Sequence, residues 1–235
     1  FPSVEKLLPF CRCRIITYGK EKEAGFSAHL VSAGEDDMKA LLKRGGVEVG
    51  MMTVPLPGMH NLMNVVAASA LLMDMGIPFE EIARGVATFR GVRRRMEVVA
   101  EKGGVIIIDD FAHHPTAVME TLAALRMRFG DRRLWAIFEP RTATSRRAFF
   151  QKDYPEAFLM ADRIVVAEVY EPERIPEQER FSSLRLVEDL EKAGKAAFFL
   201  PDVEEIVSFV ASRGEPGDVV VFMSNGPFGE APRRM

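Results

Sequence analysis

The sequence has few cysteines, no long apolar run and no excess of positive charge, and each shortage excludes a class of protein. Its two cysteines, Cys11 and Cys13, are spaced too closely for an easy disulfide, so we expect structural thiols in a reducing cytoplasm. No apolar run approaches the ~20 residues of a membrane span, and no secretory signal opens the chain. The formal net charge of -3 argues against broad electrostatic binding of nucleic acid. We therefore predict a cytoplasmic protein that binds neither membranes nor nucleic acids.

Motifs of two common site classes are also missing. No G-x-G-x-x-G follows any expected strand, which argues against a dinucleotide-dependent oxidoreductase. No H-E-x-x-H or cysteine spacing supports a zinc site, and adjacent histidines seldom converge on one metal ion. What remains is an ordinary globular composition, 48% hydrophobic and 28% charged, in 235 residues. That length is enough for two small domains or one large one.

The segment V-I-I-I-D-D-F-A-H-H-P-T, residues 105–116, is the most informative in the chain. Its β-branched apolar run predicts a strand that is buried on both faces, as in a parallel sheet covered by helices. The strand would end at Asp109 and Asp110, and a helix would begin at the proline that follows His113 and His114. Open α/β sheets bind ligands at this end of their strands. Taken singly, each of these residues is as easily explained as a turn or helix-cap residue.

The segments after residue 95 repeat this strand-helix pattern. The expected strands lie near Val105, Leu134, Ile164, Ala197 and Val219, and the expected helices at 116–128, 149–160, 184–192 and 203–212. The strand spacing is close to the ~30 residues of a βαβ unit. We therefore predict that residues 95–235 form a doubly wound, Rossmann-like, mostly parallel sheet domain.

Residues 1–94 have a different pattern and are assigned to a separate domain of β-hairpins and helices. The segment R-I-I-T-Y-G predicts a short strand, and R-G-G predicts the turn of a hairpin. A helix is expected to begin near His60 and to stop at Gly76. Asn61 and Asn64 are three apart at its start. They are either a cap and an exposed amide, or two amides on one face that hydrogen-bond the edge of a base.

Three further polar clusters follow predicted helices or strands. G-V-R-R-R-M-E is either a solvated linker or an arginine cluster that reaches a phosphate at a domain junction. F-E-P-R-T-A-T is either a basic helix cap or part of a binding site, and M-S-N-G is either a glycine turn or a rim of backbone N–H groups. These segments contain the arginines at 93–95, then Arg141, Thr142 and Thr144, and finally Ser224 and Asn225.

Taken together and in this order, these motifs resemble the carboxyl-terminal half of the Mur ligase family, the ATP-dependent amide-forming enzymes of bacterial cell-wall synthesis. The matching segments are P-G-M-H-N-L-M-N, G-V-R-R-R-M-E, I-D-D-F-A-H-H-P-T, F-E-P-R-T-A-T and M-S-N-G-P-F-G, between Tyr18 and Phe228. The resemblance implies ATP and Mg²⁺ as cofactors. It also implies that a muramyl carboxylate is converted to an acyl phosphate, which a free amine then attacks.

The resemblance also implies roles for individual residues. As catalytic residues it indicates Arg95, Asp110 and His113; for nucleotide binding His60, Asn61, Asn64, Arg95 and Asp110; and for the amine substrate Arg141, Thr142, Thr144, Ser224 and Asn225. Arg93, Arg94, Asp109 and His114 are adjacent candidates. The asparagine pair and the acid-imidazole cluster are expected to face one nucleotide cleft, and no metal ligand is assigned to this chain.

Two branches of the family compete as the nearer likeness. The branch that adds L-alanine to UDP-N-acetylmuramate carries F-Q-P-H-R where this chain has F-E-P-R-T. F-E-P-R-T and M-S-N-G look more like the branch that joins UDP-N-acetylmuramate to the tripeptide L-Ala-γ-D-Glu-meso-diaminopimelate. We therefore expect these two substrates as partners, in peptidoglycan recycling. L-alanine and a nucleotide-binding module without chemistry of its own are the alternatives.

The chain also departs from the family pattern. The phosphate-binding G-x-G-K-[ST] loop does not occur, and the chain starts at F-P-S-V-E-K without an initiator methionine. We therefore expect a fragment that needs the missing amino-terminal half of the same protein and does not catalyse ligation alone. Pro227 and Glu230 stand where the family pattern has glycines, which affects the shape of the last turn.

Overall fold

A computed structural model describes residues 4, 6–20 and 23–235. The chain divides into two compact units, Phe1–Arg90 and Gly91–Met235, which are described separately below. The sequence analysis places the domain boundary between residues 94 and 95. The structural division lies between Arg90 and Gly91, so all three arginines at 93–95 fall within the second unit. The assignment of the first unit to the end of a central ATP-binding domain stays a prediction.

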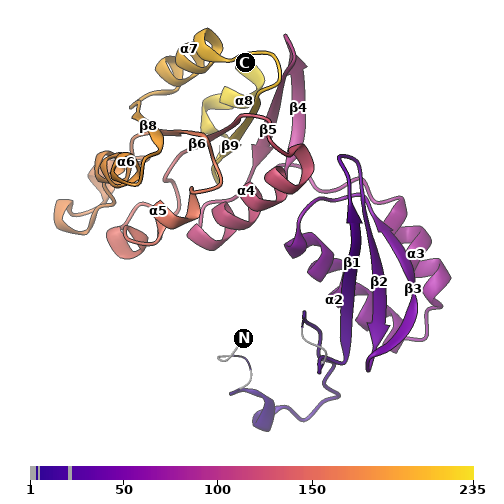
Figure 1. The fold of residues 1–235 in the computed structure, drawn as a ribbon. Coiled ribbons are helices and arrows are strands. Elements are labelled where there is room, and N and C mark those ends of the chain that lie inside the picture. The colour runs from indigo at the N-terminus through magenta and orange to yellow at the C-terminus, as the bar shows by residue number, and fades with distance from the viewer. Residues whose placement is uncertain (1–3, 5, 21–22) are drawn as a thin grey trace. The chain divides into compact units, whose positions relative to one another are not determined.

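Within its described residues, the first unit contains a three-stranded antiparallel sheet and the helices α2 and α3 (Figure 1). Its elements are η1 (Leu8–Phe10), β1 (Phe26–Ala33), β2 (Met38–Arg44), β3 (Val47–Val54), α2 (Met59–Asp74) and α3 (Phe79–Ala87). The predicted hairpin is confirmed: Gly45 and Gly46 join β2 to β3 with φ of 54° and 80°. Two consecutive positive φ values define the turn type that matches the twist of a hairpin, and glycine adopts them without steric cost.

The predicted strand over R-I-I-T-Y-G is wrong. Only Tyr18 forms an isolated bridge, to Phe26, and the N–H of Phe26 donates to the Thr17 carbonyl at 2.9 Å. The pairing does not extend into a ladder, so a β-rich composition is not enough to make a strand here. Cys11 and Cys13 precede this segment, and both are free and exposed.

The second unit is a six-stranded sheet in the order β4-β5-β9-β6-β7-β8. Its strands are β4 (Glu97–Lys102), β5 (Val105–Asp110), β6 (Leu134–Phe138), β7 (Arg163–Val166), β8 (Ala196–Phe199) and β9 (Val219–Met223). All neighbouring pairs are parallel except β4 with β5, which are antiparallel. The predicted mostly parallel, doubly wound sheet is therefore confirmed.

Helices cover both faces of this sheet (Figure 1). The helices are α4 (Pro115–Phe129), α5 (Tyr154–Ala157), α6 (Ser183–Lys192), α7 (Val203–Arg213) and α8 (Ala231–Arg234), with short 3-10 turns η2 (Ala148–Phe150), η3 (Pro172–Arg174), η4 (Glu177–Glu179) and η5 (Phe228–Glu230). Alternate residues of the strands, such as Ile108 and Ile107, belong to two separate cores, because successive strand residues point to opposite faces. The first core contains residues of α4, α5 and α6, and the second contains residues of α7 and α8.

The helix predicted over 149–160 is shorter than expected. Only η2 and the four residues of α5 are helical there. Pro155 lies in the first turn of α5, where its missing N–H is harmless, but a helix arriving from Phe149 could not continue through it.

The strands β5, β9 and β6 end in register. Asp110 and Phe138 both pair with Met223. The hydrogen bonding extends one residue further, because the N–H of Ser224 donates to the Asp110 carbonyl and the N–H of Glu139 donates to the Met223 carbonyl, each at 3.1 Å. The residues that follow these three strands are therefore neighbours at one edge of the sheet.

Candidate functional site

The carboxyl ends of β5, β6 and β9 gather most of the predicted site residues of the second unit. We call this group the carboxyl-edge cluster. It consists of Arg94, Arg95, Asp109, Asp110, His113, Glu139, Arg141, Ser224 and Asn225.

Asp110 is buried and braces the surrounding loops. One carboxylate oxygen accepts from the N–H of Ala112 at 2.8 Å and from the Thr121 hydroxyl at 3.2 Å, and the other accepts from the N–H of Met96 at 2.7 Å. Burial raises the pKa of Asp110 above its ordinary 3.8, although these hydrogen bonds oppose the rise. Both oxygens are thus engaged with the chain itself. The predicted nucleotide contact of Asp110 stays a prediction.

The segment on either side of Arg95 has an unusual backbone. Arg94 and Met96 have φ of 57° and 49°, in the left-handed region, which costs a non-glycine residue about 1 kcal/mol or more. Asp110 holds the N–H of Met96, and the N–H of Phe111 donates to the Arg94 carbonyl at 2.8 Å. The exposed Arg95 guanidinium lies 5.2 Å from the centre of the Phe111 ring. Two residues with strained, left-handed backbone therefore lie on either side of Arg95, which is exposed at this edge.

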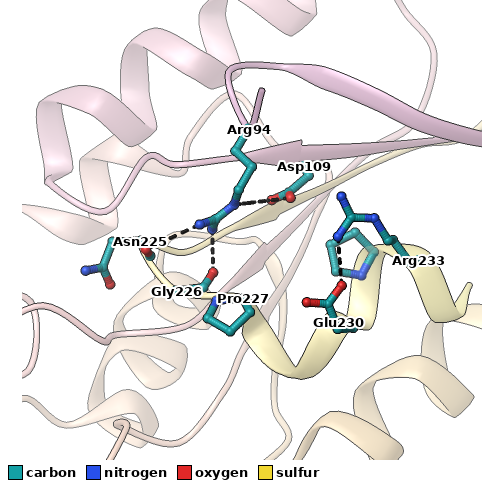
Figure 2. A pocket seen from close by; sticks show the side chains of 8 residues that line it. Arg94, Asp109, Asn225, Gly226, Pro227, Glu230 and Arg233 are labelled. Carbon is teal, nitrogen blue, oxygen red and sulfur yellow. Dashed lines mark hydrogen bonds and ion pairs between the residues drawn. The ribbon is translucent and has the colours of Figure 1, made fainter. Parts of the chain in front are cut away.

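Arg94 binds the turn that follows β9 (Figure 2). Its Nε donates to Asp109 at 3.3 Å, and its two terminal nitrogens donate to the carbonyls of Ser224 at 2.6 Å, Asn225 at 3.4 Å and Gly226. Arg94 is only an adjacent candidate in the sequence analysis, whereas Arg95 is a predicted site residue. No signal in the run R-R-R distinguishes an arginine that binds the protein from one that faces solvent.

Asp109 is the second carboxylate at the end of β5, and it lines a pocket of about 150 Å³ together with the 225–227 turn and α8 (Figure 2). Burial raises the pKa of Asp109, and the nearby Arg94 opposes the rise. On the other side of the pocket, Arg233 pairs with Glu230 at 2.7 Å. The Asn225 side-chain oxygen is buried and finds no hydrogen-bond partner among the described residues.

The two histidines have different surroundings. His113 Nδ1 lies 2.9 Å from the Phe111 carbonyl, which can only accept, so Nδ1 carries the proton and Nε2 is the basic nitrogen. Tyr154 fixes the same loop by donating its hydroxyl to the His113 carbonyl at 2.6 Å. His114 caps α4 through the N–H of Thr116 at 3.3 Å and packs against a phenylalanine ring. The Nδ1 atoms of both histidines are thus engaged locally, that of His113 as a donor and that of His114 as an acceptor.

Glu139 connects the ends of β6 and β9, and sequence reasoning missed it. The buried Ser224 hydroxyl donates to the buried Glu139 carboxylate at 2.5 Å, and Arg141 lies 3.5 Å from the other carboxylate oxygen. Arg141 also lies 3.6 Å from the centre of the Tyr170 ring. A Cβ on Gly226 would lie 2.1 Å from Arg141 Nε, so the guanidinium occupies the space that a side chain would need. The signal was present: a glutamate at a strand end, two residues before Arg141.

The two predicted threonines begin the turn after β6. The Thr142 hydroxyl accepts from the N–H of Ser145 at 3.0 Å and lies 3.2 Å from the Thr144 hydroxyl. Ser145 Oγ in turn accepts from the N–H of Thr142 at 2.9 Å. Thr142 thus stabilises this turn as well as being a candidate binding residue, and Thr144 is exposed.

The remaining predicted residues lie on α2 in the first unit. Gly58, not Asn61, is the residue that begins this helix, with φ of 97°. The Asn61 amide donates to the Pro57 carbonyl at 2.8 Å, Asn64 is exposed one turn later, and His60 is half-buried beside them. Whether these residues face the same nucleotide as the carboxyl-edge cluster stays a prediction.

Within the described residues, no group of three or more histidine, cysteine, aspartate or glutamate side chains is placed to hold a metal ion. The same part of the chain contains no helix with the length and apolarity needed to span a bilayer.

Comparison with known proteins relates both units to one family. The family model "Mur ligase, glutamate ligase domain" matches residues 94–226. The UDP-N-acetylmuramate–L-alanine ligase of Desulfitobacterium hafniense (strain Y51) is 31% identical over 212 residues, which are 90% of this chain and 47% of that protein.

Two solved structures extend the comparison. The UDP-N-acetylmuramate–alanine ligase of Thermotoga maritima has a TM-score of 0.79 at 24% identity and shares the fold, over 93% of this chain and 46% of that one. A murein peptide ligase from Psychrobacter arcticus 273-4 has a TM-score of 0.65 at 25% identity, over 99% and 48%. The chain thus spans about half the length of the curated relatives it matches.

Proposed function

Because the chain belongs to the Mur ligase family, we propose that it is the carboxyl-terminal part of an ATP-dependent, cytoplasmic ligase that joins UDP-N-acetylmuramate to an amine. The observation that carries the proposal is the meeting of three family motifs, D-D-F-A-H-H, E-P-R-T and S-N-G, at one edge of the second unit. The missing amino-terminal half would supply the phosphate loop and the sugar site. This chain alone would therefore be inactive.

The proposed reaction forms an amide in two transfers. A carboxylate oxygen of the muramyl sugar attacks the γ-phosphorus of ATP, and ADP leaves. The amine nitrogen then attacks the activated carbonyl carbon, the bond from that carbon to the phosphate oxygen breaks, and the nitrogen loses a proton. ATP with Mg²⁺ supplies the phosphoryl group. This route needs fixed cations near developing negative charge and a group that accepts the proton.

The chain's own residues fit these needs. The exposed Arg95 lies between two residues with left-handed backbone, its guanidinium contacts the Phe111 ring, and its N–H groups would bind phosphate oxygens. His113 Nε2 is the basic nitrogen of its ring and would accept the amine proton. Asp110 would act as a positioning residue for both, because its oxygens hold the backbone N–H groups of Met96 and Ala112. His60, Asn61 and Asn64 would contact the adenine.

The amine would be bound at the ends of β6 and β9. Arg141, Thr142, Thr144, Ser224 and Asn225 are the residues that we assign to it. For the amine itself we propose L-Ala-γ-D-Glu-meso-diaminopimelate, because the residues that resemble the tripeptide branch, Glu139 and Ser224, form one hydrogen-bonded pair. L-alanine is the second candidate, because the Desulfitobacterium relative is an L-alanine ligase at 31% identity.

Phosphate release by the full-length protein tests both candidates. With ATP, Mg²⁺ and UDP-N-acetylmuramate present, we expect release on addition of the tripeptide and much less with L-alanine. The opposite preference would assign the protein to the alanine branch. Nucleotide binding by calorimetry without phosphate release from any of these mixtures would contradict a ligase and favour a nucleotide-binding module.

A further inference from the structure

We propose that Arg94, which contacts no substrate in this scheme, is the positioning residue that sets the amine-binding pocket by fixing the turn 224–226. This inference rests on the proposed function for its catalytic readout. Its structural part stands on the contacts of Arg94 alone.

Arg94 binds the whole turn. Its guanidinium donates to three successive carbonyls, those of Ser224, Asn225 and Gly226, while its Nε is held by Asp109. Among the described residues these three carbonyls have no other hydrogen-bond donor. Only arginine presents donors in a planar fork that can satisfy several acceptors at once. Lysine would keep the charge and lose that geometry.

The turn in its place positions two candidate binding residues, Ser224 and Arg141. The Ser224 hydroxyl donates to Glu139 and accepts from the N–H of Gly226 at 3.0 Å. Gly226 in turn lies against the Arg141 guanidinium, which has no room to move toward the turn. A displacement of the three carbonyls would therefore shift both Ser224 and Arg141. Arg94 thus acts on the pocket through the turn, without contacting its ligand.

Arg126 provides a matched control within the same unit. Arg126 also donates to three carbonyls, those of Gly130, Arg132 and Met160, and to one carboxylate, that of Asp162. It does so at the other edge of the sheet, before β6 and β7 begin. A purely structural arginine clamp predicts equal consequences for the two residues.

The experiment compares R94K with R126K in the full-length protein. We expect R94K to displace the turn and raise KM for the amine substrate on the order of tenfold. That is the effect of losing roughly one charged hydrogen bond between the pocket and the amine substrate. KM for ATP should change less than about twofold, and R126K should leave both KM values near wild type. Equal effects of the two variants would overturn the proposal, and so would a rise in KM for ATP alone, which would indicate an action through Arg95.

Hydrogen exchange on this chain separates the inference from the proposed function. R94K should speed amide exchange in residues 224–230 and leave residues 130–134 unchanged, and R126K should do the reverse. If exchange responds in this way while the full-length protein shows no ligase activity, the proposed function fails and the positioning role of Arg94 stands. If R94K leaves exchange in residues 224–230 unchanged, the positioning role fails.

Discussion

The amino and carboxyl edges of the second unit's sheet each hold a buried aspartate, and the two carboxylates have opposite pKa shifts. Asp218, before β9, accepts from Arg133 through both oxygens at 2.8 Å, and also from Trp135 and the N–H of Glu215. Burial would raise its pKa, but these bonds outweigh burial and the pKa is lowered. Asp110, the last residue of β5, accepts from two backbone N–H groups and a hydroxyl, which are all neutral, and burial raises its pKa.

The difference separates a stabilising ion pair at one edge of the sheet from the proposed binding site at the other. At the amino edge a bidentate guanidinium satisfies the carboxylate, so the charge contributes to stability. At the carboxyl edge the guanidinium of Arg94 is directed mainly to backbone carbonyls, and Arg95 points to solvent. The carboxyl edge therefore holds guanidinium and carboxylate groups that are not fully paired with each other, as expected of a site that binds charged ligands.

The largest effect is expected from Asp110→Ala. It leaves the N–H groups of Met96 and Ala112 without an acceptor inside the protein, and an unpaired buried donor costs about 1–3 kcal/mol. We expect the free energy of unfolding to fall on the order of 3 kcal/mol, measured with urea. Asp110→Asn keeps an acceptor oxygen and should lose less. An alanine variant as stable as wild type would show that the brace is not needed.

Asp218→Asn tests the opposite edge and should cost about 2 kcal/mol at neutral pH, because it weakens the bonds to the charged Arg133. The folded-state pKa of Asp218 is below the ordinary 3.8, so its stabilisation is present above 3.8 and is lost as pH falls through the folded value. Unfolding curves at a series of pH values should therefore show the variant approaching wild type in acid. A constant difference across this range would contradict the lowered pKa.

Asp109→Asn should have a smaller effect and the reverse pH dependence. The folded-state pKa of Asp109 is raised above 3.8, so its contribution to stability is fully present below 3.8 and is lost as pH rises through the folded value. The asparagine does not ionise, so the variant should gain stability relative to wild type as pH rises. At pH 7 we expect the free energy of unfolding to change by no more than about 1 kcal/mol. The loss of the ion pair with Arg94 opposes the gain from removing a buried charge. A difference that moves the other way would remove the contrast between the two edges.

The smallest change in stability is expected from Gly226→Ala. The three atoms nearest to the new Cβ all belong to the flexible Arg141 side chain, which would leave its position over the Tyr170 ring at a cost of about 0.5–1 kcal/mol. The amine KM of the full-length protein should nevertheless rise several-fold, because Arg141 is assigned to that substrate. Gly85→Ala is the control, because a Cβ added there meets nothing within 4 Å outside its own helix backbone. An unchanged amine KM would remove Arg141 from the proposed pocket.

Local patterns in the sequence were enough for several elements. Three examples are the β-branched run that begins at Val105, the Gly45-Gly46 turn and the proline at the start of α4. In each, the residue types strongly favour one backbone conformation. The predicted strand over residues 14–19 was wrong because the segment finds no partner strand beyond the single bridge at Tyr18. The helix predicted over 149–160 is shorter than expected because it cannot continue through Pro155.

The sequence by itself determined that this chain is α/β and that acids, imidazoles and arginines follow its strands, because periodicity and strand-end chemistry are local properties. Only the tertiary structure decided that Arg94 binds the 224–226 turn while Arg95 stays exposed, and that Glu139 joins Ser224 to Arg141. Those assignments depend on which strands lie side by side. The order β5-β9-β6 brings together residues that are more than a hundred positions apart in the chain, such as Arg94 and Ser224, whose sequence separation is 130.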